Sequence, residues 1–143
     1  MRQATRHDKD QIKFLLRCFR DESGFQQLQN IEDNQSLDHL LDSILVGAGI
    51  CYIEDGKGLL IAAILPSIWD HKIMLMHELA WYVLPEHRGT SVGLKLFLAY
   101  QLYGNQLKQE GRIKYFTLSK YDRSPNLNYE KRGFVKKDEN WIC

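Results

Sequence analysis

The feature that most constrains this chain is the segment from His77 to Phe97, which has the pattern of a strand, a loop and a helix. Apolar and aromatic residues alternate with other residues up to Val83, and Pro85 ends the strand because it has no N–H to donate. A glycine-containing loop follows, and leucines and aromatics then recur at helical spacing. The first N–H groups of such a helix lack internal acceptors and lie at the positive end of its dipole. This junction is therefore suited to hold a phosphate or diphosphate.

Length and charge limit the classes of protein to consider. A chain of 143 residues fits a single domain, expected over residues 1–143, and its net charge of +1 argues against a nucleic-acid binder driven by bulk charge. The cysteines Cys18, Cys51 and Cys143 are far apart, and no H-x-x-x-H pair occurs, so we expect neither a disulfide framework nor a metal site. No apolar run approaches the ~20 residues needed to cross a bilayer. We expect a cytoplasmic protein.

Hydrophobic periodicity predicts an α/β chain. Helical patterns run up to Ser23-Gly24, from Ser36 to the glycines at 47 and 49, and from the loop to about Glu110. The β-prone runs are residues 50–54, 59–65, 71–83 and 113–118, with one or two closing strands expected near 134–135 and 141–142. An Asp-Gly turn joins the first two runs, and the strand at 113–118 is expected to be parallel to the strand before the helix. Residues 124–129 hold at most a turn or two of helix.

Two motifs resemble one known family. The run V-L-P-E-H-R-G-T-S-V-G-L-K-L resembles the acyl-CoA-binding segment of the GNAT superfamily of N-acetyltransferases, V-x-P-x-x-[QR]-x-x-G-x-[GA], with Arg88 and Gly93 on the [QR] and [GA] positions. Ser91 stands where the middle glycine is usual. Downstream, Y-E-K-R-G-F at residues 129–134 resembles the Y-x-x-x-G-F end of the same family's cofactor-binding region. The resemblance spans roughly residues 2–142.

The resemblance implies a fold and a cofactor. The GNAT fold is a mixed, mostly antiparallel sheet, expected here with six to seven strands flanked by helices. Its fourth and fifth strands splay apart, and the pantetheine arm of acetyl-CoA enters the gap. The residues that this assigns to the cofactor are Trp81, Tyr82, Val83, Leu84, Arg88, Gly89, Thr90, Ser91, Val92, Gly93 and Asn126. For the side chains of Trp81 and Tyr82 the alternative is plain core packing.

The implied reaction moves an acetyl group from acetyl-CoA to a primary amine of a small molecule or protein, by direct transfer with general acid-base assistance. Glu78 is the candidate base, because an ammonium must lose a proton before it attacks and a carboxylate among apolar neighbours has a raised pKa. The alternative is a strand glutamate that faces solvent or pairs with a cation. His77 lies on the opposite face if the strand is regular, and a bulge would reverse that parity.

Tyr129 is the candidate acid, since the family's tyrosine in Y-x-x-x-G-F commonly lies near the cofactor sulfur. The family usually has an asparagine seven residues earlier, whereas Asn126 is three residues before the tyrosine and follows Pro125. The alternative for Tyr129 is a core tyrosine whose hydroxyl reaches water.

Acidic side chains gather in and between the first two helices, where the family often lines its acceptor site. They form either a solvated face or a rim that attracts an amine: Asp21, Glu22, Glu32, Asp33, Asp38 and Asp42. The alternative function is a non-catalytic GNAT-fold binding or structural module with weak or no CoA binding. The sequence does not specify the acceptor or the oligomeric state, and it is compatible with a homodimer.

Overall fold

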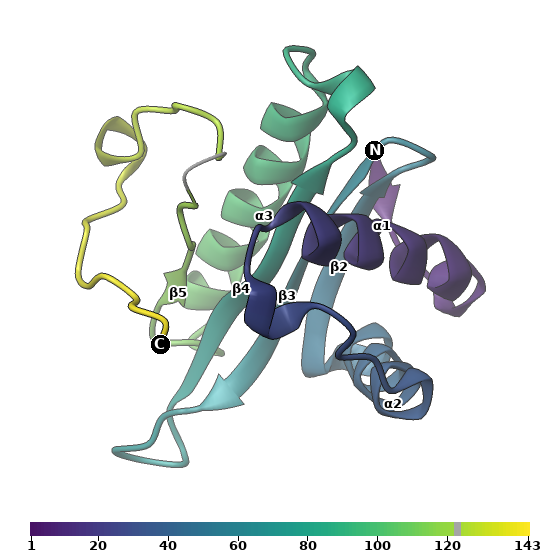
Figure 1. Cartoon of the computed structure of the whole chain (residues 1–143). Helices are drawn as coiled ribbons and strands as arrows, with labels where there is room; N and C mark the ends of the chain where they lie inside the picture. Colours follow the sequence, from purple (N-terminus) through teal and green to yellow (C-terminus); the bar gives the residue numbers. More distant parts are fainter. Residues whose placement is uncertain (122–123) are drawn as a thin grey trace.

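The computed structural model describes residues 1–121 and 124–143 and places five strands of this part of the chain in one sheet (Figure 1). The strands are β1 (Arg2–Gln3), β2 (Gly49–Glu54), β3 (Gly58–Pro66), β4 (Met74–Val83) and β5 (Phe116–Thr117), and they lie in that order. The first four are antiparallel to their neighbours, whereas β5 is parallel to β4. A helix connects β4 to β5, as a parallel pair requires.

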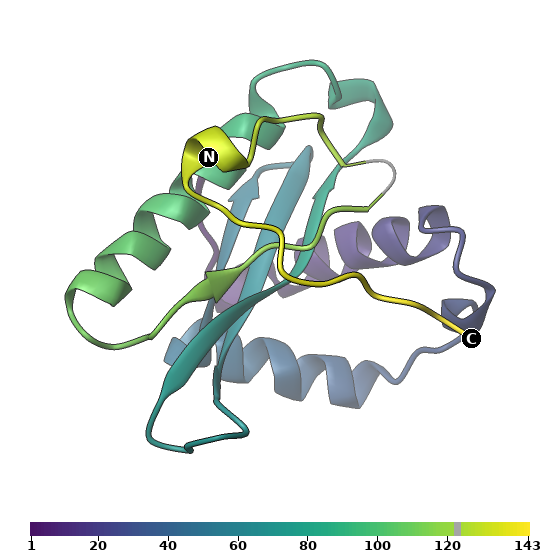
Figure 2. The ribbon, with the colours of Figure 1, turned by 90° about the vertical axis from the view of Figure 1, so that its left-hand side faces the viewer.

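Three α-helices cover the two faces of the sheet (Figures 1 and 2). α1 (Lys9–Glu22) and α2 (Asn34–Ser43) lie on one face, and α3 (Val92–Gln109) lies on the other. Short helices join these elements: η1 (Arg6–Asp8), η2 (Gln26–Leu28), η3 (Ile44–Ala48), η4 (Pro85–His87) and η5 (Glu130–Arg132).

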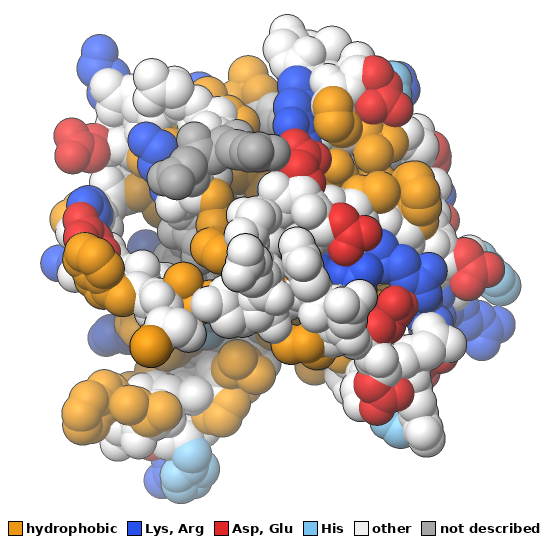
Figure 3. Space-filling view, viewed as in Figure 1, with side chains coloured by type: hydrophobic (Ala, Val, Ile, Leu, Met, Phe, Trp, Pro, Cys, Tyr) orange, Lys and Arg blue, Asp and Glu red, His pale blue; other side chains and the backbone are white. Residues whose placement is uncertain are grey.

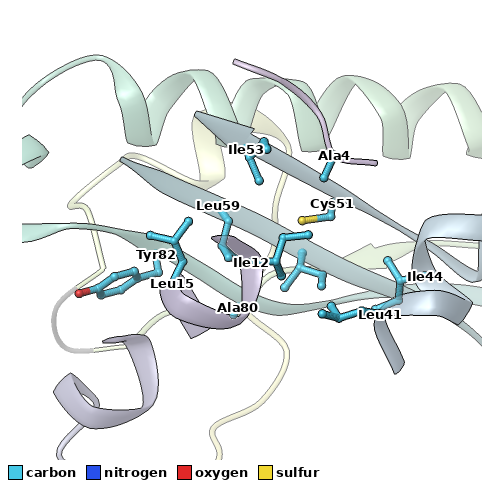
Figure 4. Packing of buried hydrophobic residues seen from close by; sticks show 11 residues of the cluster. Ala4, Ile12, Leu15, Leu41, Ile44, Cys51, Ile53, Leu59, Ala80 and Tyr82 are labelled. Carbon is cyan, nitrogen blue, oxygen red and sulfur yellow. The ribbon is translucent and has the colours of Figure 1, made fainter. Parts of the chain in front are cut away.

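Each face of the sheet has its own hydrophobic cluster. On the α1 and α2 face, Ile12 and Leu41 pack with Leu59 of β3 (Figure 4). On the α3 face, Leu96 packs with Leu60 of β3. Because both faces are covered, β3 is apolar along its length and does not alternate with polar residues.

A β-bulge in β4 decides which face each of its residues occupies. Ala80 pairs with Ile61 and Glu78 pairs with Ala62, so Leu79 is the extra residue. Ala80 belongs to the cluster under α1, whereas Ala62, and Glu78 beside it, lie on the α3 side. The bulge follows Glu78, so the segment that holds His77 is regular and His77 and Glu78 point to opposite faces, as predicted for a regular strand.

Most predicted elements are confirmed. α2 begins at Asn34, before the predicted Ser36, because Asp33 caps it through the amide of Gln35. Thr5 and Asp8 form a capping box at the start of η1. Gly56 adopts a φ of 68° in the turn between β2 and β3, and Gly111 has a φ of 70° just beyond α3. These local signals lie in short stretches of sequence, which is why the pattern predicts them well.

The predicted number of strands is wrong. The sheet of the described residues has five strands and not six or seven, and β5 covers only Phe116–Thr117 of the run predicted at 113–118. Residues 134–135 and 141–142 carry no strand and belong to an irregular segment along the β5 side of the sheet (Figures 1 and 2). Residues 124–129 contain no helix, which agrees with the prediction of at most a turn or two, and η5 follows them.

Weak burial explains the missing strands. The side chains of Val135, Trp141 and Ile142 are 70%, 89% and 57% exposed, so an added strand would gain little from the core. Charged residues separate the two short apolar runs, and Lys136 and Glu139 pair locally across them. Phe134 is the anchor of this segment, packed edge-on against Phe116.

Among the described residues, no helix is long and apolar enough to span a membrane.

Candidate cofactor and active site

The separation of β4 from β5 creates the site. The two strands pair at Met76 with Phe116 and at His77 with Thr117, and no described residue after Thr117 continues the ladder. β4 itself continues to Val83. The part of β4 after His77 is therefore hydrogen-bonded to β3 on one side and open on the other. This agrees with the expected splay of the fourth and fifth strands.

A cavity of about 310 Å³ lies at the open end of β4. Its walls come from the end of α1, the end of β4, the segment after it and the chain after β5. The lining residues are Phe19, Glu22, Ser23, Phe25, Trp81, Tyr82, Val83, Arg88, Tyr121, Ser124 and Pro125. The Phe19 ring contacts two tyrosine rings edge-on. Its centroid lies 6.0 Å from that of Tyr82 and 5.6 Å from that of Tyr121. Aromatic walls with a few polar groups are typical of a ligand site.

Glu78 lies where the two strands begin to separate. Its side chain is buried, with a residue exposure of 8%, and its Oε2 accepts a hydrogen bond from the Ser119 amide at 2.9 Å. Oε1 is buried and has no hydrogen-bond partner among the described residues. Burial raises the pKa of Glu78 from its ordinary 4.5 to about 7, against the lowering effect of the Ser119 amide. The alternative of a solvent-facing or cation-paired glutamate is therefore wrong.

His77 has a separate role in the strand pair. Its Nδ1 lies 2.9 Å from Thr117 Oγ1, in the residue pair that closes the β4–β5 ladder. Because its side chain points to the face opposite Glu78, the two do not act on one proton.

The loop before α3 has an open first turn. Gly89 adopts a φ of 75°, and the Thr90 hydroxyl donates to the carbonyl of His87 at 2.6 Å. Ser91 is the N-cap residue but makes no side-chain cap, so its hydroxyl is not used by the helix. At Gly93, an added Cβ would make only ordinary contacts with Val83 and Trp81, at 3.7 and 3.8 Å. The start of α3 therefore packs against the end of β4 at this position, and a methyl group could be added without a clash.

Trp81 and Tyr82 fall on opposite faces of β4. The Trp81 ring stacks on Phe97 of α3 with centroids 5.7 Å apart, and its Nε1 is buried without a partner in the part of the chain that the structure describes. Tyr82 packs in the cluster under α1, with its hydroxyl at the outer end of the cluster (Figure 4). Core packing thus accounts for both rings, but both also line the cavity.

Arg88 does not lie free beside the loop. Its two terminal nitrogens donate to the two carboxylate oxygens of Glu22, at 2.6 and 2.7 Å, and its Nε donates to the Val83 carbonyl at 2.9 Å. The guanidinium also lies 5.5 Å from the centre of the Tyr82 ring. The Glu22 carboxylate raises the pKa of Arg88, and Tyr82 donates its hydroxyl to Glu22 Oε2 at 2.8 Å.

Part of the expected pantetheine-binding backbone is already used. The Leu84 amide donates to the Lys57 carbonyl at 2.8 Å, and the Val83 carbonyl accepts from Arg88. Leu84 is therefore not an available donor, which corrects the expectation for that residue. The reason is that the chain past β4 turns back onto the β2–β3 hairpin, a contact that no local pattern predicts.

Tyr129 and Asn126 lie beside the site and do not line the cavity. The Tyr129 hydroxyl donates to the Pro125 carbonyl at 2.8 Å, and its ring lies edge-on against Phe97 at 6.1 Å. Burial and the charge of Glu78 raise the pKa of Tyr129, so the two groups interact electrostatically. The Tyr129 ring packs on the core residue Phe97 and the hydrogen bond of its hydroxyl lies at an exposed position, so the alternative of a core tyrosine stays open. Asn126 is exposed.

The acidic residues of the first two helices are mostly paired with cations. Glu32 binds Arg17, Asp38 binds Lys13 and Asp42 binds Lys9, at 2.6 to 2.7 Å. Figure 3 shows these blue and red side chains next to one another over α1 and α2. Of the six, Glu22 is the one that lines the cavity. The helical pattern of the first helix includes Phe19, but the sequence did not bring Glu22 together with Phe19, Phe25 and Tyr121. Their common position is set by tertiary contacts.

Comparison with known proteins gives a consistent result at the level of structure. No family model matches the chain, and no curated protein matches its sequence. Among solved structures, a predicted acetyltransferase from Clostridium acetobutylicum, crystallised with acetyl-CoA, is similar with a TM-score of 0.73 and 17% identity over 99% of this chain and 93% of that one.

Two further solved structures are similar over the same share of this chain. An aminoglycoside acetyltransferase from an uncultured soil metagenomic sample has a TM-score of 0.64 and 16% identity, and 90% of its chain is covered. A ribosomal-protein-alanine N-acetyltransferase from Brucella melitensis biovar Abortus 2308 has a TM-score of 0.60 and 16% identity, with 96% covered. The predicted resemblance is therefore confirmed in three dimensions, and the chain has the fold of the GNAT superfamily of acetyltransferases.

Proposed function

We propose that this protein transfers an acetyl group from acetyl-CoA to a primary amine of a small molecule or protein, with residues 1–143 acting as one domain. The observation that carries the proposal is Glu78, a buried carboxyl with a pKa of about 7 and one unpartnered oxygen at the point where β4 and β5 separate. A group of this kind accepts protons near neutral pH, and an ammonium must lose one before its nitrogen attacks. The acetyltransferase neighbours, which share the fold, support this class of reaction.

The residues around the opening fit acetyl-CoA, which supplies the acetyl group as a thioester. The amides from Gly89 to Gly93 would hold the diphosphate at the start of α3, together with Arg88. The unpartnered indole N–H of Trp81 supports a ligand there. The free edge of β4 from Trp81 to Val83 would pair with the amides of pantetheine.

Two residues would move the protons. Glu78 accepts one proton of the ammonium, directly or through one water molecule, and the nitrogen lone pair forms the C–N bond while the C–S bond breaks. The new amide nitrogen then loses its second proton to solvent. The electron pair left on sulfur takes a proton, for which Tyr129 is the proposed donor. Its hydroxyl is bonded to the Pro125 carbonyl, so the tyrosine would have to exchange this partner for the sulfur. Solvent would then restore the phenolic proton.

The second candidate is a GNAT-fold module that binds without catalysis. It is favoured by the same two contacts that occupy the expected functional groups, namely Tyr129 with Pro125 and Arg88 with Glu22. An aminoglycoside acetyltransferase and a ribosomal-protein-alanine acetyltransferase share the fold, so the fold alone does not choose between a small-molecule and a protein acceptor.

Calorimetric titration with acetyl-CoA, followed by a screen for thiol release over small amines and peptides, tests the proposal. We expect binding, release of thiol with at least one amine, and loss of about 10²–10⁴-fold in turnover for Glu78→Gln. Binding without thiol release from any amine would favour the non-catalytic module. Absence of acetyl-CoA binding would contradict the proposed transferase and leave only the module without CoA binding.

A further inference from the structure

Glu22 and Arg88 form an ion pair across the cavity. They are the charged residues among the described residues that line it, and they are 66 positions apart in the sequence. Glu22 is the last residue of α1, whereas Arg88 follows the end of β4, so the pair joins two elements on either side of the opening. The other ion pairs of α1, with Asp21, Glu32, Asp38 and Asp42, involve no cavity-lining residue.

Three of the five N–H donors of the Arg88 guanidinium are used. Both terminal nitrogens of Arg88 contact Glu22, and Nε contacts the Val83 carbonyl. A planar guanidinium that holds one carboxylate in two parallel hydrogen bonds cannot present the same edge to a phosphate. Val83 also belongs to the strand edge that a ligand amide would bond. Arg88 in this position therefore withholds two groups from a ligand: its own charge and the Val83 carbonyl.

We propose that Glu22 is a positioning residue for the cofactor site, and that Arg88 exchanges Glu22 for the diphosphate of acetyl-CoA when the cofactor binds. This inference rests on the proposed function. A diphosphate carries more negative charge than one carboxylate and lies at the positive end of α3, so it competes well for the arginine. Release of Nε frees the Val83 carbonyl in the same movement. Glu22 keeps its hydrogen bond from the Tyr82 hydroxyl, which holds its carboxylate in the cavity wall.

The exchange lowers the affinity for cofactor, because the ion pair must break before Arg88 can bind phosphate. The apparent affinity for cofactor is the intrinsic affinity multiplied by the fraction of molecules in which Arg88 is released from Glu22. Both side chains are partly exposed, at 40% and 22%, so the pair is weaker than a buried one. Removal of the Glu22 charge should therefore tighten binding by about three- to tenfold.

The experiment is a calorimetric titration of the whole chain with CoA and, separately, with inorganic pyrophosphate. It compares the wild type with Glu22→Gln, Arg88→Ala and the double variant. We expect Glu22→Gln to bind both probes about three- to tenfold tighter than the wild type. The double variant should bind both probes with the same affinity as Arg88→Ala. Glu32→Gln is the matched control, since Glu32 pairs with Arg17 of the same helix and lies outside the cavity wall. It should leave both affinities at the wild-type value.

The outcomes separate this inference from the proposed function. If CoA binds the wild type and Glu22→Gln equally, or binds Glu22→Gln more weakly, the exchange is wrong and the cofactor assignment stands. If neither the wild type nor Glu22→Gln binds CoA or pyrophosphate, both the exchange and the proposed function are wrong. Should Glu22→Gln not fold, Glu22→Asp serves instead, because a side chain one methylene shorter weakens the two-point contact with Arg88. It should also tighten binding.

Discussion

Glu78 and Ser119 meet where β4 and β5 separate, with the Ser119 amide 2.9 Å from Glu78 Oε2. Ser119 lies two positions beyond Thr117, the last residue of β5 that pairs with β4. The hydrogen bond holds the carboxyl at the start of the opening, while Oε1 keeps its full capacity to accept a proton. A buried carboxyl in this state titrates near neutral pH, and the first two predictions follow from that property.

Glu78→Gln should lower turnover by about 10²–10⁴-fold near neutral pH and by less at high pH, where much of the acceptor is already free amine. In the wild type, kcat/KM should rise with pH through about 7, because the carboxyl must lose its proton to act as a base. Steady-state thiol release between pH 5.5 and 9.5 measures both effects. A variant with the wild-type rate at every pH would remove Glu78 from the mechanism.

Glu78 should also make folding stability depend on pH. The pKa of this carboxyl is about 7 in the folded protein and near 4.5 when unfolded, so the folded state binds the extra proton between these values. The free energy of unfolding should therefore fall as pH rises from 4.5 to 7, by about 3 kcal/mol from this group. The glutamine in Glu78→Gln cannot titrate, so the free energy of unfolding of this variant should lack that part of the decrease with pH. Urea unfolding of both proteins at pH 4.5 and 8 measures the difference, and parallel losses of stability would contradict the buried, unpaired carboxyl.

Tyr129→Phe should lower turnover and leave the affinity for CoA nearly unchanged, since the hydroxyl contacts Pro125 and the ring can keep its contact with Phe97. Loss of a general acid costs about 10²–10⁴-fold. Tyr115→Phe, which changes an exposed tyrosine before β5, is the matched control and should retain the wild-type rate. Equal rates for Tyr129→Phe and the control would assign the proton to another donor.

Arg88→Ala should weaken CoA binding about tenfold and leave the fold intact. The charge-assisted contact with the diphosphate is worth roughly 1.5–3 kcal/mol, and loss of the competing pair with Glu22 offsets part of it. Raising the salt concentration should reduce the difference, because the contact is ionic. Unchanged affinity at low salt would show that the amides of the loop bind the cofactor without the arginine.

Gly104→Ala should destabilise the protein by about 1–3 kcal/mol. A Cβ at position 104 would lie 2.7 to 2.8 Å from ring atoms of Phe116, so the ring or the helix must shift. Asn105→Ala, at the next and exposed position of α3, should be neutral or slightly stabilising, because alanine has the higher helix propensity. Thermal unfolding of the two variants compares them directly. A stable Gly104→Ala variant would mean that α3 and β5 are not packed this closely.

The sequence by itself determined the elements that short-range chemistry defines. The Asp55-Gly56 turn and the loop before α3 each act within a few positions of the chain, so their patterns predict them. The sequence also named Glu78 as the candidate base, but it left open whether the side chain faces solvent, and tertiary packing decided that it is buried. The two motifs predicted the GNAT fold, which the comparison with solved structures confirms.

Tertiary structure decided the rest. The bulge at Leu79 arises from the pairing of β3 with β4, and the partner of Arg88 is a residue 66 positions away. The expected closing strands depend on whether the sheet gains buried area from them, and the exposure of Trp141 shows that it does not. Such outcomes depend on which surfaces meet after folding, and a local pattern carries no information about a partner that lies far along the chain.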